Sequence, residues 1–197
     1  MGLTGGIACG KSSVIEILKN KGIKVINADD LAHQAYEPGN PAFNKILAEF
    51  GRDFLGENGQ IDRKKLARLV FTDDKARARL ERIVHPVVLD ALKDRLKYWA
   101  GRGEKLVVVE IQLLYEVGWE SLFDQIWVVT APEAEQLQRL KSRDQLSEEN
   151  AVSRIKAQLP LNYKEKKADV VINNCQGLTD LKKQVERLLA GMLDSIR

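Results

Sequence analysis

The chain has 197 residues, of which 44% are hydrophobic and 30% are charged, as expected for a globular protein with one compact domain. Lysine and arginine number 31 against 28 aspartates and glutamates, and this net charge of +3, without a long basic run, argues against a nucleic-acid-binding protein. The chain does not open with a charged segment followed by an apolar stretch, and no apolar run approaches the length of a membrane span, so we expect neither a signal peptide nor a membrane partner.

Strand and helix signals alternate along the chain. In chain order, short apolar or β-branched runs predict strands at 24–26, 106–111, 126–129 and 169–172. Apolar residues at helical spacing predict helices over 14–18, 80–92 and 178–192, and residues from about 37 to 100 contain no convincing strand signal. Ser147, which precedes two glutamates, is a predicted helix N-cap. This order predicts an α/β fold with a doubly wound parallel sheet and one helical insertion, in which the ligand binds at the carboxyl ends of the strands.

A glycine-rich loop lies close to the N-terminus. Residues 5–12 read Gly-Gly-Ile-Ala-Cys-Gly-Lys-Ser and fit the whole G-x-x-x-x-G-K-[ST] pattern, which we call the phosphate loop. Its glycines let successive backbone N–H groups point at phosphate oxygens, Lys11 adds a positive charge, and the hydroxyl of Ser12 can bind Mg²⁺. The alternative is a glycine-rich turn at a helix start, which the complete motif argues against. Only Met1 to Leu3 precede Thr4, so we expect either a very short strand before the loop or a sequence that begins a few residues late.

The class of phosphate-loop protein follows from what else the sequence contains. It has no Asn-Lys-x-Asp motif of the kind that reads guanine, and it is too short for a transporter-type ATPase. The remaining class is the small-molecule kinases, which combine this loop with a helical acceptor subdomain and a lid that carries arginines. The two cysteines, Cys9 and Cys175, lack metal-ligand spacing, so we expect reduced thiols in a cytoplasmic protein.

Beyond the loop, the chain resembles the dephospho-CoA kinases. The most diagnostic segment, 25–39, reads Val-Ile-Asn-Ala-Asp-Asp-Leu-Ala-His-Gln-Ala-Tyr-Glu-Pro-Gly, and further matches occur, in the same order, at 2–14, 58–63, 85–86, 113–116, 143–144, 154–158 and 168–174. The resemblance implies transfer of the γ-phosphoryl group of ATP to the ribose 3′-hydroxyl of dephospho-CoA, which gives coenzyme A. It also implies a P-loop NTPase fold with a doubly wound five-stranded parallel sheet. Within a single kinase domain, 1–197, it places a helical CoA-binding subdomain at about 30–100 and a lid at about 140–158.

The resemblance assigns roles to individual residues. Asp29 is the expected base for the acceptor hydroxyl and shares Mg²⁺ with Ser12, although it could instead be the N-cap of a helix that starts at Asp30. Lys11 and Arg143 are expected to act on the transferring group, although surface ion pairing is the usual state of an arginine. The expected nucleotide-binding residues are Gly5, Gly6, Ile7, Ala8, Cys9, Gly10, Lys11, Ser12, Ser13, Arg139, Arg154 and Asn174.

A second set is expected to bind the acceptor. Its members are His33, His85, Leu113, Leu114, Tyr115 and Glu116. The alternatives are solvated or locally capping histidines and leucines that belong to the core. The chain departs from the usual family pattern at Asn27 and Ser13, and also at 110–114, where it reads Glu-Ile-Gln-Leu-Leu instead of Asp-x-Pro-Leu-Leu.

The sequence leaves two alternatives open. One is a P-loop kinase for another nucleotide or metabolite, and the other is an ATP-binding protein without catalytic activity. The enzyme interpretation predicts ATP, Mg²⁺ and dephospho-CoA as small-molecule partners, and a monomer or a small homo-oligomer.

Overall fold

The structure is a computed structural model that describes residues 1–196. The chain divides into two compact units. The first comprises Met1–Ile26 and the residues from Gly103 onward, and the second comprises Asn27–Arg102. Among the described residues, no helix is both long and apolar enough to cross a membrane.

The first unit is built on a five-stranded parallel sheet with the strand order β2-β3-β1-β4-β5. The strands are β1 (Gly2–Gly5), β2 (Lys24–Asn27), β3 (Val107–Glu110), β4 (Ile126–Thr130) and β5 (Val170–Asn173). This confirms the predicted doubly wound α/β fold, and each predicted run lies within a residue or two of its strand. Because the strands are parallel, the chain crosses over between each strand and the next instead of turning in a tight hairpin.

The strand that leads into the phosphate loop, β1, is buried and paired on both of its edges. All four of its residues are buried, and the strand pairs in parallel with both β3 and β4, so that Leu3 lies opposite Glu110 on one side and Trp127 on the other. A central strand gains hydrogen bonds and apolar contacts on both edges. The four residues of β1 match the length of β2, β3 and β5.

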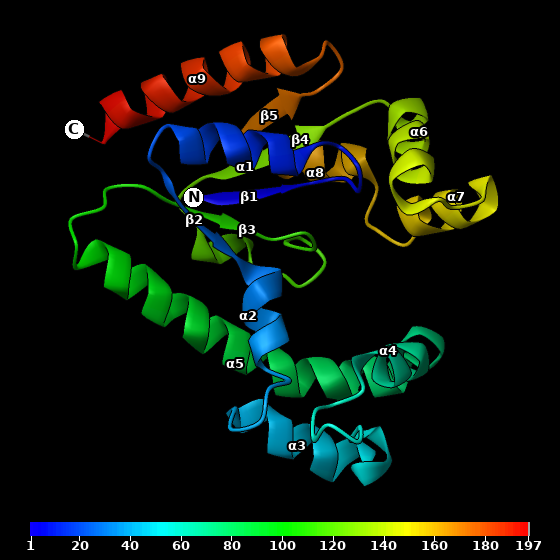
Figure 1. The fold of residues 1–197 in the computed structure, drawn as a ribbon. Helices are drawn as coiled ribbons and strands as arrows, with labels where there is room; N and C mark the ends of the chain where they lie inside the picture. The colour runs from blue at the N-terminus through cyan, green and yellow to red at the C-terminus, as the bar shows by residue number, and fades with distance from the viewer. Residues whose placement is uncertain (197) are drawn as a thin grey trace. The chain divides into compact units, whose positions relative to one another are not determined.

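Helices complete the first unit. They are α1 (Lys11–Asn20), α6 (Glu133–Asp144), α7 (Glu148–Lys156), α8 (Leu161–Lys167) and α9 (Leu178–Ser195), with a 3₁₀ turn, η2 (Glu120–Leu122). Figure 1 shows α1 and α9 side by side, and the two helices are in contact. Their apolar stripes join the sheet in one core, in which Val14, Leu18, Trp127 and Val185 are almost fully buried. The hydroxyl of Ser147 accepts the Asn150 N–H at 3.3 Å, which confirms the predicted start of α7.

The second unit is helical. It contains α2 (Ala28–Gln34), α3 (Pro41–Phe50), the 3₁₀ turn η1 (Arg52–Phe54), α4 (Arg63–Thr72) and α5 (Asp74–Ala100). The long helix α5 contacts α2, α3 and α4. Leu80 and Val84 of α5 are buried, and so are Ile46 of α3 and Leu66 of α4. Pro86 lies inside α5, so the helix continues through a residue that cannot donate a backbone hydrogen bond.

Candidate active site

The phosphate loop connects β1 to α1, and its tight packing requires glycine at two positions. A Cβ on Gly5 would lie 2.3 Å from the carbonyl oxygen of Val129, so only glycine lets β1 turn beside β4. Gly10 has a φ of +92°, and a Cβ there would lie 2.1 Å from Nδ2 of Asn174. Between them, Ala8 also has a left-handed backbone, with a φ of 58°. This backbone is compatible with inward-facing N–H groups at the start of a helix.

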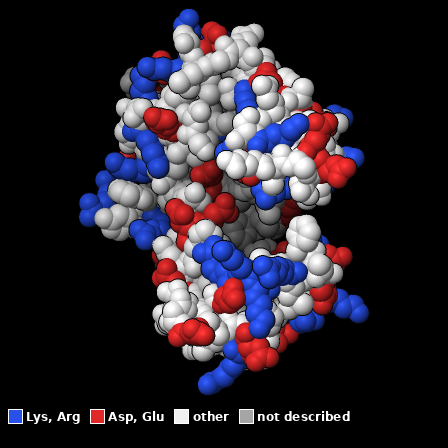
Figure 2. Space-filling model, turned by 45° about the vertical axis from the view of Figure 1, so that its right-hand side comes forward, with Lys and Arg blue, Asp and Glu red and all other residues white. Residues whose placement is uncertain are grey.

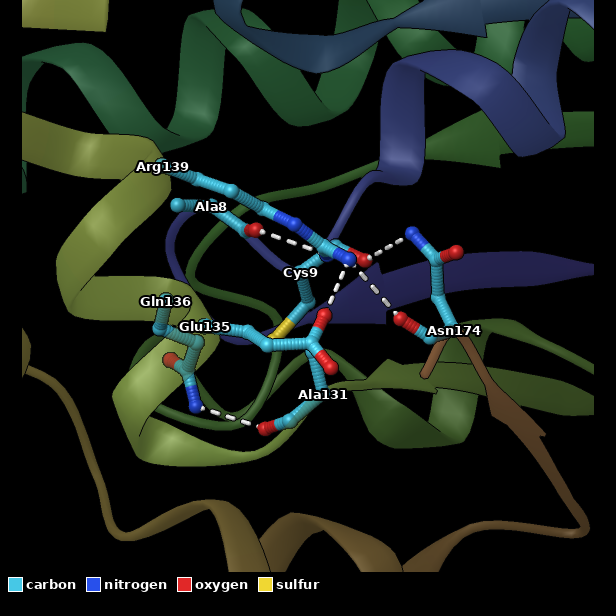
Figure 3. Close-up of polar contacts among 7 residues, drawn as sticks. All are labelled: Ala8, Cys9, Ala131, Glu135, Gln136, Arg139 and Asn174. Carbon is cyan, nitrogen blue, oxygen red and sulfur yellow. Dashed lines mark hydrogen bonds and ion pairs between the residues drawn. The ribbon is translucent and has the colours of Figure 1, made fainter. Parts of the chain in front are cut away.

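Arg139 and Asn174 both reach the loop (Figure 3). Arg139, on α6, donates from Nη1 to the carbonyl oxygen of Ala8 at 3.5 Å and from Nη2 to the carbonyl oxygen of Asn174 at 3.0 Å. It also forms an ion pair with Glu135, one helical turn earlier. Asn174, which follows β5, donates from Nδ2 to the carbonyl oxygen of Cys9 at 2.9 Å. The structure therefore brings these two predicted nucleotide-side residues together at the loop.

A cavity of about 670 Å³ adjoins the loop, and we call it the loop cavity. Its lining residues come from the phosphate loop, the end of β3 and the far end of α6; they are Ile7, Ala8, Gly10, Lys11, Ser12, Glu110, Gln112, Arg139, Ser142 and Arg143. Lys11 is 7% exposed, so its charge is held against the cavity wall rather than in solvent. The lining contains three cationic side chains, Lys11, Arg139 and Arg143, and one carboxylate, that of Glu110. This excess of positive charge favours an anionic ligand.

The two arginines that the sequence places in a predicted lid, Arg143 and Arg154, converge on one carboxylate. Arg143 donates from Nε and Nη2 to the two oxygens of Asp144 at 2.8 and 3.1 Å, and Arg154 donates to Oδ2 of the same residue at 2.8 Å. The hydrogen bonds from Arg143 are the largest cause of the lowered pKa of Asp144. A second ion pair, between Lys141 and Glu148 at 2.8 Å, also joins α6 to α7. Arg143 and Arg154 are thus held together by Asp144, and both side chains remain about half exposed.

Asp29 lies in the first turn of α2, in the second unit. Oδ1 of Asn27 accepts the N–H groups of Asp29 at 2.8 Å and Asp30 at 3.4 Å, so Asn27 is the N-cap. The alternative in which Asp29 caps a helix that starts at Asp30 is therefore wrong. Asp29 is exposed and lines a cavity of about 940 Å³ in this unit, which we call the second-unit cavity. His33, one turn further along α2, lines it too, and so do Tyr36 and Arg63.

The other predicted acceptor residues are placed differently. His85 lies on α5, outside the lining of the second-unit cavity. Leu113 is 42% exposed, whereas Leu114 is fully buried and Tyr115 is 6% exposed. Burial, with help from nearby Asp169, raises the pKa of Tyr115 to about 12.

Glu116 is held by two polar contacts. Its Oε1 lies 2.7 Å from Nζ of the fully buried Lys164 and accepts the Leu159 N–H at 3.0 Å. The linings of the loop cavity and the second-unit cavity include none of Leu113, Leu114, Tyr115 and Glu116.

The two cysteines differ in their surroundings. Cys9 is buried beneath the loop, and its sulfur lies 2.7 Å from the place of a Cβ on Gly6. Burial raises the pKa of the Cys9 thiol, although the charge of Lys11 acts in the opposite direction. Cys175, directly after Asn174, is exposed.

The sequence comparisons decide the family. The family model for dephospho-CoA kinase matches residues 1–180. This chain belongs to the dephospho-CoA kinase family. A dephospho-CoA kinase from Carboxydothermus hydrogenoformans is 43% identical over 189 residues, which cover 96% of this chain and 92% of the relative. Another, from Shouchella clausii, is 46% identical over 174 residues and covers 88% of either chain.

Solved structures resemble the chain as well. The dephospho-CoA kinase from Campylobacter jejuni has a TM-score of 0.75 at 31% identity, and covers 100% of this chain and 98% of its own. TT1252 from Thermus thermophilus has a TM-score of 0.80 at 35% identity, and covers 96% of this chain and 95% of its own. Shikimate kinase from Acinetobacter baumannii, with a TM-score of 0.53 at 20% identity, shares the fold alone.

The structure also identifies two residues of the candidate site that the sequence did not predict. Ser142 lines the loop cavity, and Asp144 accepts hydrogen bonds from both Arg143 and Arg154. The only sequence signal for Asp144 is its place directly after Arg143. The face in Figure 2 shows small groups of lysine and arginine bordered by aspartate and glutamate. The excess of positive charge is therefore a property of the loop cavity and not of that face as a whole.

Proposed function

We propose that this chain phosphorylates the ribose 3′-hydroxyl of dephospho-CoA with ATP, and so completes coenzyme A. The observation that carries the proposal is the loop cavity, where a complete phosphate loop meets Arg139 and Arg143, in a chain of the dephospho-CoA kinase family. Phosphoryl transfer depends on positioning and on electrostatic stabilisation of the transferring group, and the cavity supplies cations for both.

The donor, ATP, is proposed to occupy the loop cavity. Backbone N–H groups of the loop would bind phosphate oxygens, Lys11 would neutralise the β- and γ-phosphates, and Arg143 would stabilise the group in transfer. Arg139 and Asn174 already contact the loop and would border the nucleotide there.

Mg²⁺ fits the oxygen donors in this cavity. Ser12 offers an exposed hydroxyl, and Glu110 and Gln112 line the same space, which suits a cation that prefers oxygen ligands and keeps several waters. Within residues 1–196 there is no cluster of three His, Cys, Asp or Glu that could hold a metal, so the substrate phosphates would supply further ligands. We propose Ser12 as the protein ligand, with a share for Asp29, and the ion would neutralise charge on the phosphates.

Asp29 is proposed as the base that accepts the proton of the 3′-hydroxyl. An aspartate that receives this proton is common in kinases, and the Asn27 cap fixes the backbone that carries Asp29. The acceptor is proposed to contact His33 and Leu113, while the buried Leu114 and Tyr115 support the segment by packing. The guanidinium of Arg63 lies over the Tyr36 ring at 5.8 Å, which gives the second-unit cavity a cationic and aromatic wall for an anionic nucleotide.

We also propose that the protein works in the cytoplasm. Both cysteines are free thiols, and free thiols are typical of proteins in a reducing compartment.

A panel of acceptors in a coupled assay of ADP release tests the function. Dephospho-CoA, a nucleoside monophosphate, adenosine and shikimate are each offered with MgATP, and only dephospho-CoA is expected to support fast turnover. Asp29→Asn is expected to lower kcat by about 10²- to 10⁴-fold, whereas the neighbouring Asp30→Asn serves as the matched control. Turnover on the monophosphate alone would favour another kinase, and MgATP binding without any transfer would favour a non-catalytic protein.

A further inference from the structure

Gln158 makes a contact that the proposed mechanism does not use. Its Oε1 accepts the backbone N–H of Ile7, in the phosphate loop, at 2.9 Å. Ile7 lines the loop cavity, so one N–H of the loop is taken by a side chain from the end of the lid. This bond fixes the orientation of the peptide between Gly6 and Ile7, and with it the path of the loop toward Ala8.

The chain on the C-terminal side of Gln158 is firmly anchored. The next residue, Leu159, donates its N–H to Glu116, which is also paired with the buried Lys164. Further along α8, Glu165 accepts a hydrogen bond from Thr130 at the end of β4. Three contacts thus hold this segment to loops and strand ends of the sheet.

The chain on the N-terminal side of Gln158 is the lid helix α7. It carries Arg154, four residues before Gln158, whose guanidinium is bound by Asp144. Gln158 therefore lies between the anchored segment that begins at Leu159 and the helix α7, which carries Arg154. Its side-chain amide connects this junction directly to the phosphate loop.

We infer that Gln158 is a positioning residue that couples the lid to the phosphate loop, so that the loop is ordered for ATP when α7 is in place. This inference rests on the proposed function, because the coupling has an effect on catalysis only if the chain uses ATP. The uncharged amide suits the role, since it accepts the Ile7 N–H without a negative charge beside the phosphates.

Two substitutions at Gln158 separate the hydrogen bond from the charge. Gln158→Met keeps the size and removes the acceptor, so we expect faster hydrogen exchange at the Ile7 amide and a KM for ATP raised roughly five- to tenfold. Its KM for dephospho-CoA should stay within about twofold. Gln158→Glu keeps the acceptor, so Ile7 should remain protected, while repulsion of the phosphates still raises the KM for ATP. Gln138→Met, on the exposed side of α6, is the matched control and should change neither readout.

The inference is overturned if Gln158→Met leaves both the Ile7 exchange and the KM for ATP unchanged. It is equally overturned if that variant raises both KM values alike with a lowered melting temperature, because that result indicates packing alone. If the Met variant does not fold, Gln158→Asn, whose amide falls one methylene short, replaces it in the same comparison. Should the chain fail to phosphorylate dephospho-CoA, the Ile7 exchange and the calorimetric affinity for ATP still test the coupling separately from the proposed function.

Discussion

The side chain of Asn174 occupies the space that a Cβ on Gly10 would need. Its Nδ2 donates to the carbonyl oxygen of Cys9 at 2.9 Å, and the same nitrogen lies 2.1 Å from the ideal Cβ position of Gly10. The turn after β5 and the phosphate loop are thus fitted to one another, and the glycine of the motif serves packing as well as backbone freedom.

We predict that Gly10→Ala abolishes measurable ATP binding. The new methyl group meets Asn174, and the φ of +92° adds about 1 to 2 kcal/mol of backbone strain. The double variant with Asn174→Ala should recover only part of the affinity, because the strain remains. Gly22→Ala is the control, since Gly22 has a φ of +82° and open space around it, so it should cost stability without loss of ATP binding. Isothermal titration calorimetry with ATP and thermal unfolding measure both effects, and normal binding by Gly10→Ala would contradict the packing argument.

Asp144 is predicted to hold Arg143 and Arg154 in a productive position. Asp144→Asn should raise the KM for ATP about three- to tenfold, because Arg143 and Arg154 lose their shared partner. Glu148→Gln, which breaks the neighbouring ion pair with Lys141, should have less than a twofold effect. Steady-state kinetics at varied ATP decide the matter. A lower KM in Asp144→Asn would instead mean that the carboxylate competes with phosphates for the arginines.

The same network has a defined pH dependence. The pKa of Asp144 is lowered, chiefly by hydrogen bonds from Arg143, so the network is present above the ordinary pKa of an aspartate and is lost only as the pH falls further. The KM for ATP should therefore show no acid limb from this residue between about pH 5 and 8. An acid limb in that range that disappears in Asp144→Asn would show that the carboxylate titrates higher than its contacts imply.

The pair formed by Lys164 and Glu116 is predicted to matter for stability. Lys164 is fully buried, so Lys164→Met leaves the Glu116 carboxylate without its cation and should lower the free energy of unfolding by about 3 to 5 kcal/mol. Adding Glu116→Gln should restore much of the loss, because no unpaired charge then remains. Lys166→Met, on an exposed position of α8, should stay within about 0.5 kcal/mol. Urea unfolding gives these values, and equal effects of the two lysine variants would refute the argument.

The two thiols are predicted to react at very different rates. Burial raises the pKa of Cys9, so its thiolate fraction grows only at a pH above the ordinary range, whereas Cys175 is exposed. At about pH 7.5, iodoacetamide should modify Cys175 first, and Cys9 should react appreciably only at higher pH or after unfolding. Mass spectrometry of the digested protein follows both sites, with Cys175→Ser as the control. Modification of Cys9 at the rate of Cys175 in the folded protein would contradict its burial.

The sequence predicted the elements whose signals are local. Apolar runs predicted the positions of β2 to β5. The glycine-rich motif predicted the phosphate loop, and Ser147 predicted the start of α7, because each of these signals depends only on neighbouring residues. Asn27 was noted as a departure from the family pattern, but its role as the cap of α2 was not predicted, since the start of that helix was placed too late.

Other features depend on tertiary structure. The bond from Gln158 to Ile7 joins residues 151 positions apart, and no spacing rule indicates it. Arg143 and Arg154 were predicted as phosphate contacts, but their convergence on Asp144 follows from how α7 folds back onto α6. The burial of Leu114 and Tyr115 is likewise set by packing, because an apolar pair after a strand is compatible with a core or with a pocket.

The exposed thiol of Cys175 is a natural attachment site for a fluorescent label. Cys175 directly follows Asn174, whose side chain donates a hydrogen bond to the phosphate loop. An environment-sensitive fluorophore on Cys175 would therefore lie next to the proposed ATP site. Because Cys9 is shielded, labelling would be selective without engineered cysteines. Emission from such a label would provide a titration of nucleotide occupancy that needs no turnover and no acceptor.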